Sequence, residues 1–293
     1  MGAKDGLAAR RSRPLFGPWL LLALLAPTVV LFVGSFAYPI GMLMGESLFV
    51  KGAVSLDNYS RIVDRPLYVN TLLRTLRVGG LTTLICLGVG FPLAWWMTRL
   101  RGLAFNLVIA CILLPLWTSI LVRSYAWVVL FQPTGLINKA LMALGLTNGP
   151  VTLLYTEGAV VTAMVHVLLP YMVLPIYSAL HNIPPNLSRA AQSLGAGAVT
   201  EFLTVILPLS RAGVVAGCVM VFVLSIGFFV TPALLGGPRT LMISTLINQQ
   251  ISSVLNWSFG GALGAALLVA TLVIILVFNR AISASRRNRG QGA

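Results

Sequence analysis

The chain has 293 residues, of which 58% are hydrophobic and only 9% are charged. A soluble domain carries roughly 25% charged residues, so this composition excludes a water-soluble enzyme. The net charge of +14 comes from 20 Lys+Arg against 6 Asp+Glu. In a membrane protein such an excess indicates topology rather than nucleic-acid binding, and no folded basic domain is present to hold a nucleic acid.

Six stretches have the length and hydrophobicity of membrane spans. An α-helix needs about 20 mostly apolar residues to cross roughly 30 Å of hydrocarbon. The six stretches are residues 18–44, 78–97, 104–122, 158–180, 212–234 and 259–278. The first is longer than the apolar core of about 7–15 residues in a secretory signal peptide, which favours an uncleaved span. The sequence therefore predicts an all-α integral membrane protein with six transmembrane helices.

The basic residues divide the chain and orient it. They predict a basic N-terminal tail (1–15), a six-span domain (16–280) and a basic C-terminal tail (281–293). An even number of spans places both tails on one side. That side receives twelve of the 20 Lys+Arg and only two acids, Asp5 and Glu201. Because basic residues in short loops and tails stay inside, we expect both termini in the cytoplasm.

Two segments on the opposite side have an interfacial character. Residues 56–76 mix tyrosines with basic residues and lead into the second span. Residues 240–255 place Ile243, Ile247, Ile251 and Val254 at helical spacing opposite a polar face. The second pattern predicts an amphipathic helix that lies on the membrane surface or caps the bundle.

The longest cytoplasmic connection is the loop 183–210, which is too polar to span but rich in helix-forming residues. Pro184 and Pro185 predict a helix start with Asn186 as its N-cap. A small apolar face follows at Ala190, Ala191 and Leu194. Gly195 and Gly197 would end this helix, a second would begin near Ala198, and Pro208 would mark its exit. The pattern predicts two short helices that project from the bilayer.

Several kinds of chemistry are missing from the sequence. It has no phosphate-binding GxxxxGK[ST] loop, no HExxH motif and no GxSxG turn. No Asp or Glu lies within the six predicted spans, although ion-coupled transporters usually place ionisable groups there. If the protein transports a solute, we therefore expect the energy to come from another chain. The alternatives are an ion-coupled secondary transporter or channel, and a scaffold that moves no solute.

The loop 183–210 resembles the signature of permease subunits of binding-protein-dependent ATP-binding-cassette (ABC) importers. That signature reads EAA, three residues, Gly, nine residues, Ile, one residue, Leu-Pro. Five of its seven slots are identical here, Val205 replaces Ile, and Arg189 reverses the charge of the leading Glu. Arg189 would place a positive charge in the first turn of the predicted helix, where it opposes the helix macrodipole. The identical slots are Ala190, Ala191, Gly195, Leu207 and Pro208.

Other stretches resemble the spermidine/putrescine branch of the same family. They include LDNYSRIVDRPLY (56–68), FPLAWWMTRL (91–100), LPLWTSILVRSYAWVVL (114–130) and FFVTPALLGG (228–237). The resemblance covers nearly the whole chain. It implies a type I ABC importer permease-like bundle with cytoplasmic coupling helices, in a bacterial inner (cytoplasmic) membrane. It also implies transport of polyamines or a related small solute, such as an amino-acid-like compound or an organophosphonate.

The resemblance further implies how the chain works with partners. This subunit would bind no cofactor itself, because ATP-Mg would be used by separate ABC ATPase subunits. A second permease subunit, a homologue or a copy of this chain, would complete the pathway. A periplasmic or lipid-anchored solute-binding protein would deliver the solute. The ATPase would contact the coupling residues Ser188, Arg189, Ala190, Ala191, Leu194, Gly195, Ala196, Gly197, Leu207 and Pro208.

Four further residues are candidates for the translocation path. Arg123 and Tyr125 lie near the predicted outer end of the third span, and Phe228 and Phe229 lie in the fifth. A guanidinium beside aromatic rings is equally typical of a side chain that reaches the membrane interface. Two apolar aromatic rings in a span also suit simple packing. Metal binding is not expected, because the His and Cys residues form no ligand cluster.

Overall fold

The computed structural model describes residues 18–50 and 52–290. Within them, six helical stretches are long and apolar enough to cross a membrane. The only strands in this part of the chain form a short antiparallel hairpin, β1 (Phe49–Val50) with β2 (Ala53–Val54). The predicted N-terminal tail, 1–15, lies outside the described residues. The all-α membrane fold predicted from composition and hydropathy is thus confirmed.

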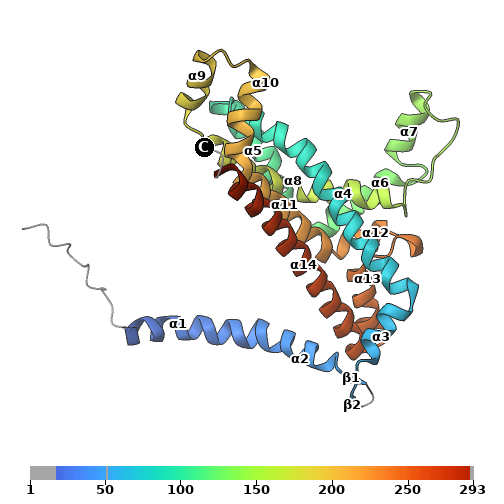
Figure 1. Ribbon diagram of the computed structural model, residues 1–293. Helices are drawn as coiled ribbons and strands as arrows, with labels where there is room; N and C mark the ends of the chain where they lie inside the picture. Colours follow the sequence, from blue (N-terminus) through green and yellow to red (C-terminus); the bar gives the residue numbers. More distant parts are fainter. Residues whose placement is uncertain (1–17, 51, 291–293) are drawn as a thin grey trace, which may run out of the picture.

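Three long helices form the centre of the bundle: α4 (Pro66–Met97), α8 (Glu157–His181) and α11 (Leu207–Gly227). They pack against one another more extensively than any other elements (Figure 1). Helix α8 is apolar on all sides, which is typical of a helix with neighbours all around it. Its Met164, Met172 and Ile176 are fully buried.

The bundle has two distinct ends. At the loop end lie α9 (Pro185–Ser193) and α10 (Ala198–Glu201), and at the platform end lie α3 (Asp57–Asp64), α13 (Ile243–Asn248) and the start of α14 (Trp257–Gly290) (Figure 1). The chain leaves α8 at the loop end and returns through α11. The position of the loop therefore depends on how α8 and α11 pack.

Glycines let α8 and α11 approach to backbone contact. A Cβ added at Gly213 would collide with the Pro175 carbonyl and lie 2.5 Å from the Cβ of Ala179. A Cβ at Gly217 would lie 2.8 Å from the Met172 sulfur. Apolar side chains gain nothing by leaving lipid for protein, so helices in a bilayer associate where small residues permit such close packing.

The second span begins earlier than the sequence predicts, because α4 includes much of the predicted approach segment. The sequence predicts a span at 78–97 after an interfacial segment at 56–76. Instead, α3 ends at Asp64, and α4 runs unbroken from Pro66 to Met97. Arg65 is extended and Pro66 occupies the first helical position, which suits a ring that has no N–H to donate. The 32 residues of α4 span about 48 Å, well beyond the hydrocarbon thickness.

The third predicted span, 104–122, contains a break. Helix α5 (Gly102–Trp117) ends before Thr118 and Ser119, which are extended with ψ of 147° and 135°. Helices α6 (Ile120–Phe131) and α7 (Leu136–Ala143) follow. The stretch Ile120–Ala143 meets the length and hydropathy of a span, whereas α5 alone is shorter. Hydropathy misses the break because both of its flanks are apolar.

The fifth predicted span, 212–234, is also broken. Helix α11 ends at Gly227, Phe228 is extended with ψ of 122°, and α12 (Val230–Leu235) begins after Phe229. The Phe228 carbonyl accepts a hydrogen bond of 2.7 Å from the Ser244 hydroxyl. A side chain of α13 therefore satisfies a carbonyl that the break leaves free.

The segment after α12 is less regular than predicted. The amphipathic helix expected at 240–255 is divided into the 3₁₀ turn η3 (Pro238–Thr240), helix α13 and the π-helical turn η4 (Gln249–Ser253). Ile243 is buried as its apolar position predicts, but Val254 is 56% exposed. The π turn changes the helical period, so residues beyond it leave the face that the spacing predicts.

The last helix extends past its predicted limits. The sequence predicts a span at 259–278 and a separate tail from 281, whereas α14 is continuous from Trp257 to Gly290. At its start, a Cβ added at Gly261 would lie 2.5 Å from the Leu43 carbonyl. The N-terminal arm therefore contacts the bundle closely at this point.

The N-terminal arm consists of α1 (Pro18–Phe32), the π turn η1 (Val33–Ala37) and α2 (Tyr38–Glu46). It extends away from the bundle and joins it only at the platform end (Figure 1). None of the span Ala23–Glu46 is buried. Val30, Leu31 and Phe32 are each 60% or more exposed.

A polar junction attaches the arm to the platform end. The Asn58 amide donates to the Ser47 carbonyl (2.9 Å) and to the Ser258 hydroxyl (2.6 Å). The Ser47 hydroxyl lies 2.7 Å from the Tyr59 hydroxyl. These contacts join the end of α2, helix α3 and the start of α14. Both Ser47 and Asn58 are buried, so each bond forms away from competing water.

We expect Gly213→Val to destabilise the bundle by about 2–3 kcal/mol, because the new side chain would force α8 and α11 apart. The matched control is Gly264→Val, since Gly264 is also helical but has no atom within 4 Å of an added Cβ. Thermal unfolding of the purified subunit in detergent measures both changes. Equal loss in the two variants would contradict the proposed close packing.

We expect Asn58→Ala to leave the buried Ser47 carbonyl without a partner, at a cost of about 1–3 kcal/mol. Amide hydrogen exchange should rise locally at the end of α2 and the start of α3. Ser60→Ala is the control, because the Ser60 hydroxyl makes only an exposed bond within α3. Unchanged exchange in Asn58→Ala would rule out the junction as the attachment of the arm.

Candidate functional site

The loop between α8 and α11 forms two short helices, as the sequence predicts. Helix α9 begins at Pro185, with Pro184 in the N-cap position at φ −61° and ψ 128°. The prediction that Asn186 caps this helix is wrong, since Asn186 lies within its first turn. The residue before a proline avoids the helical region, so Pro185 holds Pro184 extended and fixes the start there.

A Schellman motif ends α9. The N–H of Ala196 donates to the Ala191 carbonyl (3.0 Å), and the N–H of Gly195 donates to the Gln192 carbonyl (2.9 Å). Gly195 has a φ of +85°, which glycine adopts without the strain of a side chain. The predicted stop at Gly195 is confirmed. Gly197 has an ordinary φ of −70° and precedes α10 as its N-cap, so it does not end α9.

The second helix begins at Ala198 as predicted, but Pro208 does not end it. Helix α10, the π turn η2 (Phe202–Ile206) and α11 form one continuous helical run. Pro208 has no N–H to donate and lies in the first turn of α11. The N–H of Leu207 donates to the Phe202 carbonyl in the wider π turn. This turn changes the bonding register just before the proline and lets the helix continue.

Eight of the ten predicted coupling residues lie on a projecting unit at the loop end, within residues 188–197, whereas Leu207 and Pro208 begin α11. Arg189, Ala190, Gly195 and Gly197 are exposed, whereas Ser188 and Ala191 are half-buried. Leu194 at the tip is 89% exposed, and Val199 on α10 is 73% exposed. Leu194 and Val199 thus add exposed apolar area to the unit at the loop end.

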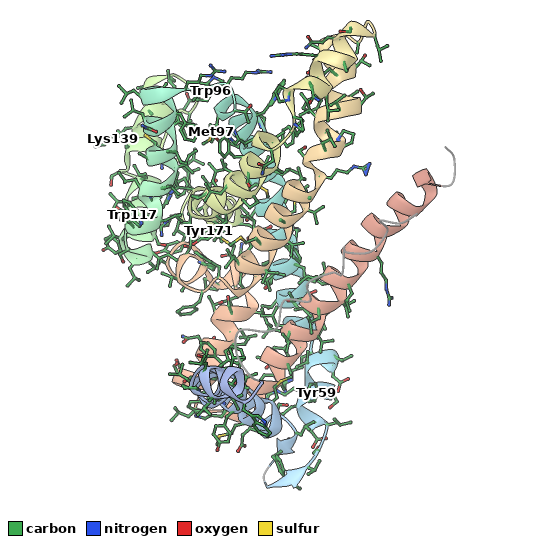
Figure 2. The ribbon with its side chains drawn as sticks, turned by 90° about the vertical axis from the view of Figure 1, so that its left-hand side faces the viewer. Tyr59, Trp96, Met97, Trp117, Lys139 and Tyr171 are labelled. Atoms are coloured by element: carbon green, nitrogen blue, oxygen red, sulfur yellow. The ribbon has the colours of Figure 1, made fainter. Side chains whose placement is uncertain are left out.

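An open pocket lies where the loop meets the bundle. The pocket measures about 340 Å³ and lies between the ends of α4 and α8 and the start of α9. Its polar lining includes Arg99, His181, Ser188 and Glu201. Figure 2 shows Trp96 and Met97 at the same end of α4. Trp95 and Phe202, which flank this region, were not predicted as site residues because an isolated aromatic residue in an apolar segment gives no signal.

The four predicted path residues come from two adjacent segments. Arg123 and Tyr125 lie on α6, and Phe228 and Phe229 lie at the break between α11 and α12. The hydroxyls of Ser124 and Thr231 are 2.9 Å apart and join α6 to α12. Tyr125 is 64% exposed and Phe229 is 37% exposed, so both rings reach the surface of this chain.

Arg123 carries the charge of this region. Its Nε and Nη1 atoms are buried and have no hydrogen-bond partner among the described residues. Nearby, the indole N–H of Trp127 donates to Nδ1 of His166 (3.2 Å). The one ion pair in residues 18–50 and 52–290 lies elsewhere, between Arg77 and Glu157.

Sequence comparison identifies relatives over most of the chain. The model of the family described as "Binding-protein-dependent transport system inner membrane component" matches residues 80–289. The spermidine/putrescine transport system permease protein PotB of Escherichia coli K12 is 34% identical over 263 residues, which cover 90% of this chain and 94% of that protein. The molybdenum transport system permease protein ModB of Azotobacter vinelandii is 30% identical over 202 residues, 67% of this chain and 88% of that protein.

Structural comparison supports the same assignment at the level of fold. A chain of a bacterial ABC transporter that imports the acidic polysaccharide alginate superposes with a TM-score of 0.74 and 22% identity. The superposition covers 92% of this chain and 96% of that chain. The predicted type I importer permease bundle is thereby confirmed. With its apolar helices and its family match, the protein is a multi-pass inner-membrane component, and it belongs to the family of binding-protein-dependent transport system inner membrane components.

Proposed function

We propose that this chain is the permease subunit of an ATP-driven ABC importer, that it lines the solute pathway, and that it docks a separate ATPase through the loop 183–210. The projecting unit formed by α9 and α10 carries this proposal, because the Schellman turn presents the exposed Leu194 away from the bundle. The ATPase, with its ATP-Mg, would seat α9 in a groove, and this subunit would hold no nucleotide.

The charge distribution supports a cytoplasmic position for the loop. Arg99, Arg101, Arg189 and Arg211 all lie in or beside the connections at the loop end. The positive-inside rule then places the loop end, and with it both termini, in the cytoplasm. The platform end, with α3 and α13, faces the periplasm, where a solute-binding protein docks. The alginate transporter provides a parallel, since its structure includes an alginate-bound periplasmic protein.

A second permease subunit completes the pathway. The arm formed by α1 and α2 is apolar and touches its own bundle only at its end. Tyr125 and Phe229 are exposed on a surface where a facing subunit would enclose them. We infer that this subunit is a homologue of the present chain, in keeping with the spermidine/putrescine branch.

Polyamines are the proposed solutes, by likeness to the PotB proteins of Escherichia coli and Haemophilus influenzae. The acids of this chain lie outside the middle of its spans. Within the described residues they stand at Glu46, Asp57, Asp64, Glu157 and Glu201. A polyamine carries several positive charges and is attracted by acids and aromatic rings. The binding protein and the second permease would therefore recognise most of the charge of the polyamine. This chain would contribute aromatic surfaces.

Docking of the ATPase can be tested at Gly195. We expect Gly195→Val to reduce ATPase co-purification about 5- to 30-fold, because a side chain at positive φ costs roughly 1–2 kcal/mol and disturbs the end of α9. Gly145→Val is the matched control, since Gly145 also has a positive φ (+69°) and open space around it but follows α7, outside the loop. If no ATPase co-purifies with the unmodified chain, and uptake instead follows an ion gradient, the chain is a secondary transporter or channel.

The solute class can be tested with the reconstituted complex. We expect ATP hydrolysis to rise when the binding protein is loaded with putrescine or spermidine, and to stay basal with an amino acid or an organophosphonate. The measurement is ATPase rate in proteoliposomes across this panel. Stimulation by another solute alone would overturn the polyamine assignment and leave the permease function intact.

A further inference from the structure

An aromatic cluster joins the loop to a helix that is distant in sequence. The ring of Phe202, in the π turn η2, lies 5.7 Å from the ring of Phe91 and 5.4 Å from that of Trp95. The Arg99 guanidinium lies 4.1 Å from the centroid of the Trp95 ring. We call Phe91, Trp95, Arg99 and Phe202 the aromatic clasp. Its members on α4 precede Phe202 by more than 100 residues.

Helix α9 is separated from the bundle end by an open pocket. The pocket of about 340 Å³ is lined by Ser188 of α9 on one side and by Trp95 of α4 and Arg99, just past the end of α4, on another. Because this open pocket lies between them, α9 does not pack closely on α4 at this point. A push on α9 therefore reaches α4 mainly through the elements that follow α9 along the chain.

Helix α9 contacts α10 and η2 directly, and a polar contact joins them as well. The Gln192 amide donates a hydrogen bond of 2.8 Å to the Glu201 carboxylate, which directly precedes Phe202. A movement of α9 is therefore delivered through Gln192 and Glu201 to Phe202, and from Phe202 to Phe91 and Trp95. Face-to-edge aromatic contacts such as the 89° pair of Phe91 and Phe202 have a preferred geometry and resist rearrangement.

Phe202, which would pass the movement of α9 to α4, lies in a π turn. In η2 the N–H of Leu207 bonds to the Phe202 carbonyl, one residue farther than in an α-helix. Such turns occur as local insertions within α-helices, often at functional sites. Leu203, the next residue, is 54% exposed and does not share the contact of Phe202 with α4.

We propose that the aromatic clasp is the connection through which the ATPase moves α4, so that Phe202 is a positioning residue for coupling ATP hydrolysis to transport. This inference rests on the proposed function. The loop is already joined by the chain to α8 and α11, and the clasp adds the third central helix. With all three central helices linked to α9, the bundle turns as one body. Without the clasp, α4 would follow the loop only through its packing against α8 and α11.

The test compares Phe202→Ala with the neighbouring control Leu203→Ala in the complete complex. We expect Phe202→Ala to bind the ATPase normally and to hydrolyse ATP, but to transport about tenfold less solute per ATP, within the usual range of coupling between sites. Leu203→Ala should keep the ratio of the unmodified complex. Transport and hydrolysis are measured together in proteoliposomes with radiolabelled spermidine.

Two more variants keep the result decisive. Phe202→Tyr keeps the ring and should restore most of the ratio, whereas Phe202→Leu keeps apolar volume without a ring and should restore little. These two also serve if Phe202→Ala does not reach the membrane. An unchanged ratio in Phe202→Leu, with the ATPase bound, would overturn the clasp. If the unmodified chain does not bind the ATPase at all, the proposed function is overturned instead.

Discussion

The backbone contact between α8 and α11 is the constraint on which the other features depend. Gly213 and Gly217 leave no room for a side chain between these helices, and at Gly213 the nearest atom is the Pro175 carbonyl oxygen, which cannot move aside as a flexible side chain can. The loop joins the end of α8 to the start of α11, so the packing of these two helices fixes the distance between the two ends of the loop. The Schellman turn at Gly195 then determines where α9 ends and α10 begins. A few glycines thus place the projecting unit at the loop end of the bundle.

The sequence predicts the features that arise from local chemistry. Hydropathy identifies the membrane class and most of the six spans because the bilayer imposes length and composition on each helix separately. The two loop helices are predictable because prolines and glycines restrict the backbone on their own, as Pro185 and Gly195 do here. The seven-slot signature is recognisable for the same reason, since its Ala, Gly and Pro residues describe a local shape. The replacement of its Glu by Arg189 leaves that shape unchanged.

The remaining features depend on neighbours that sequence spacing does not reveal. The breaks at Thr118 and Phe228 lie in apolar segments, and the second is satisfied by Ser244 from another element. The π turn before Pro208 lets a helix continue where a proline suggests an end. Asn186 fails as a cap because Pro184 already holds that position. Phe202 is one of 13 phenylalanines, and only its contacts with Phe91 and Trp95 distinguish it from the others.

Helix α4 gives the bundle a mechanical property that none of its shorter helices has. It touches the loop through Trp95 and the platform through Thr75, whose hydroxyl accepts the N–H of Ile243, and between these points it is held against α8 and α11. A stiff rod gripped along its middle acts as a lever. A push at its loop end is converted into an opposite displacement at its platform end. The movements at the two ends would then be two halves of a single rotation of α4.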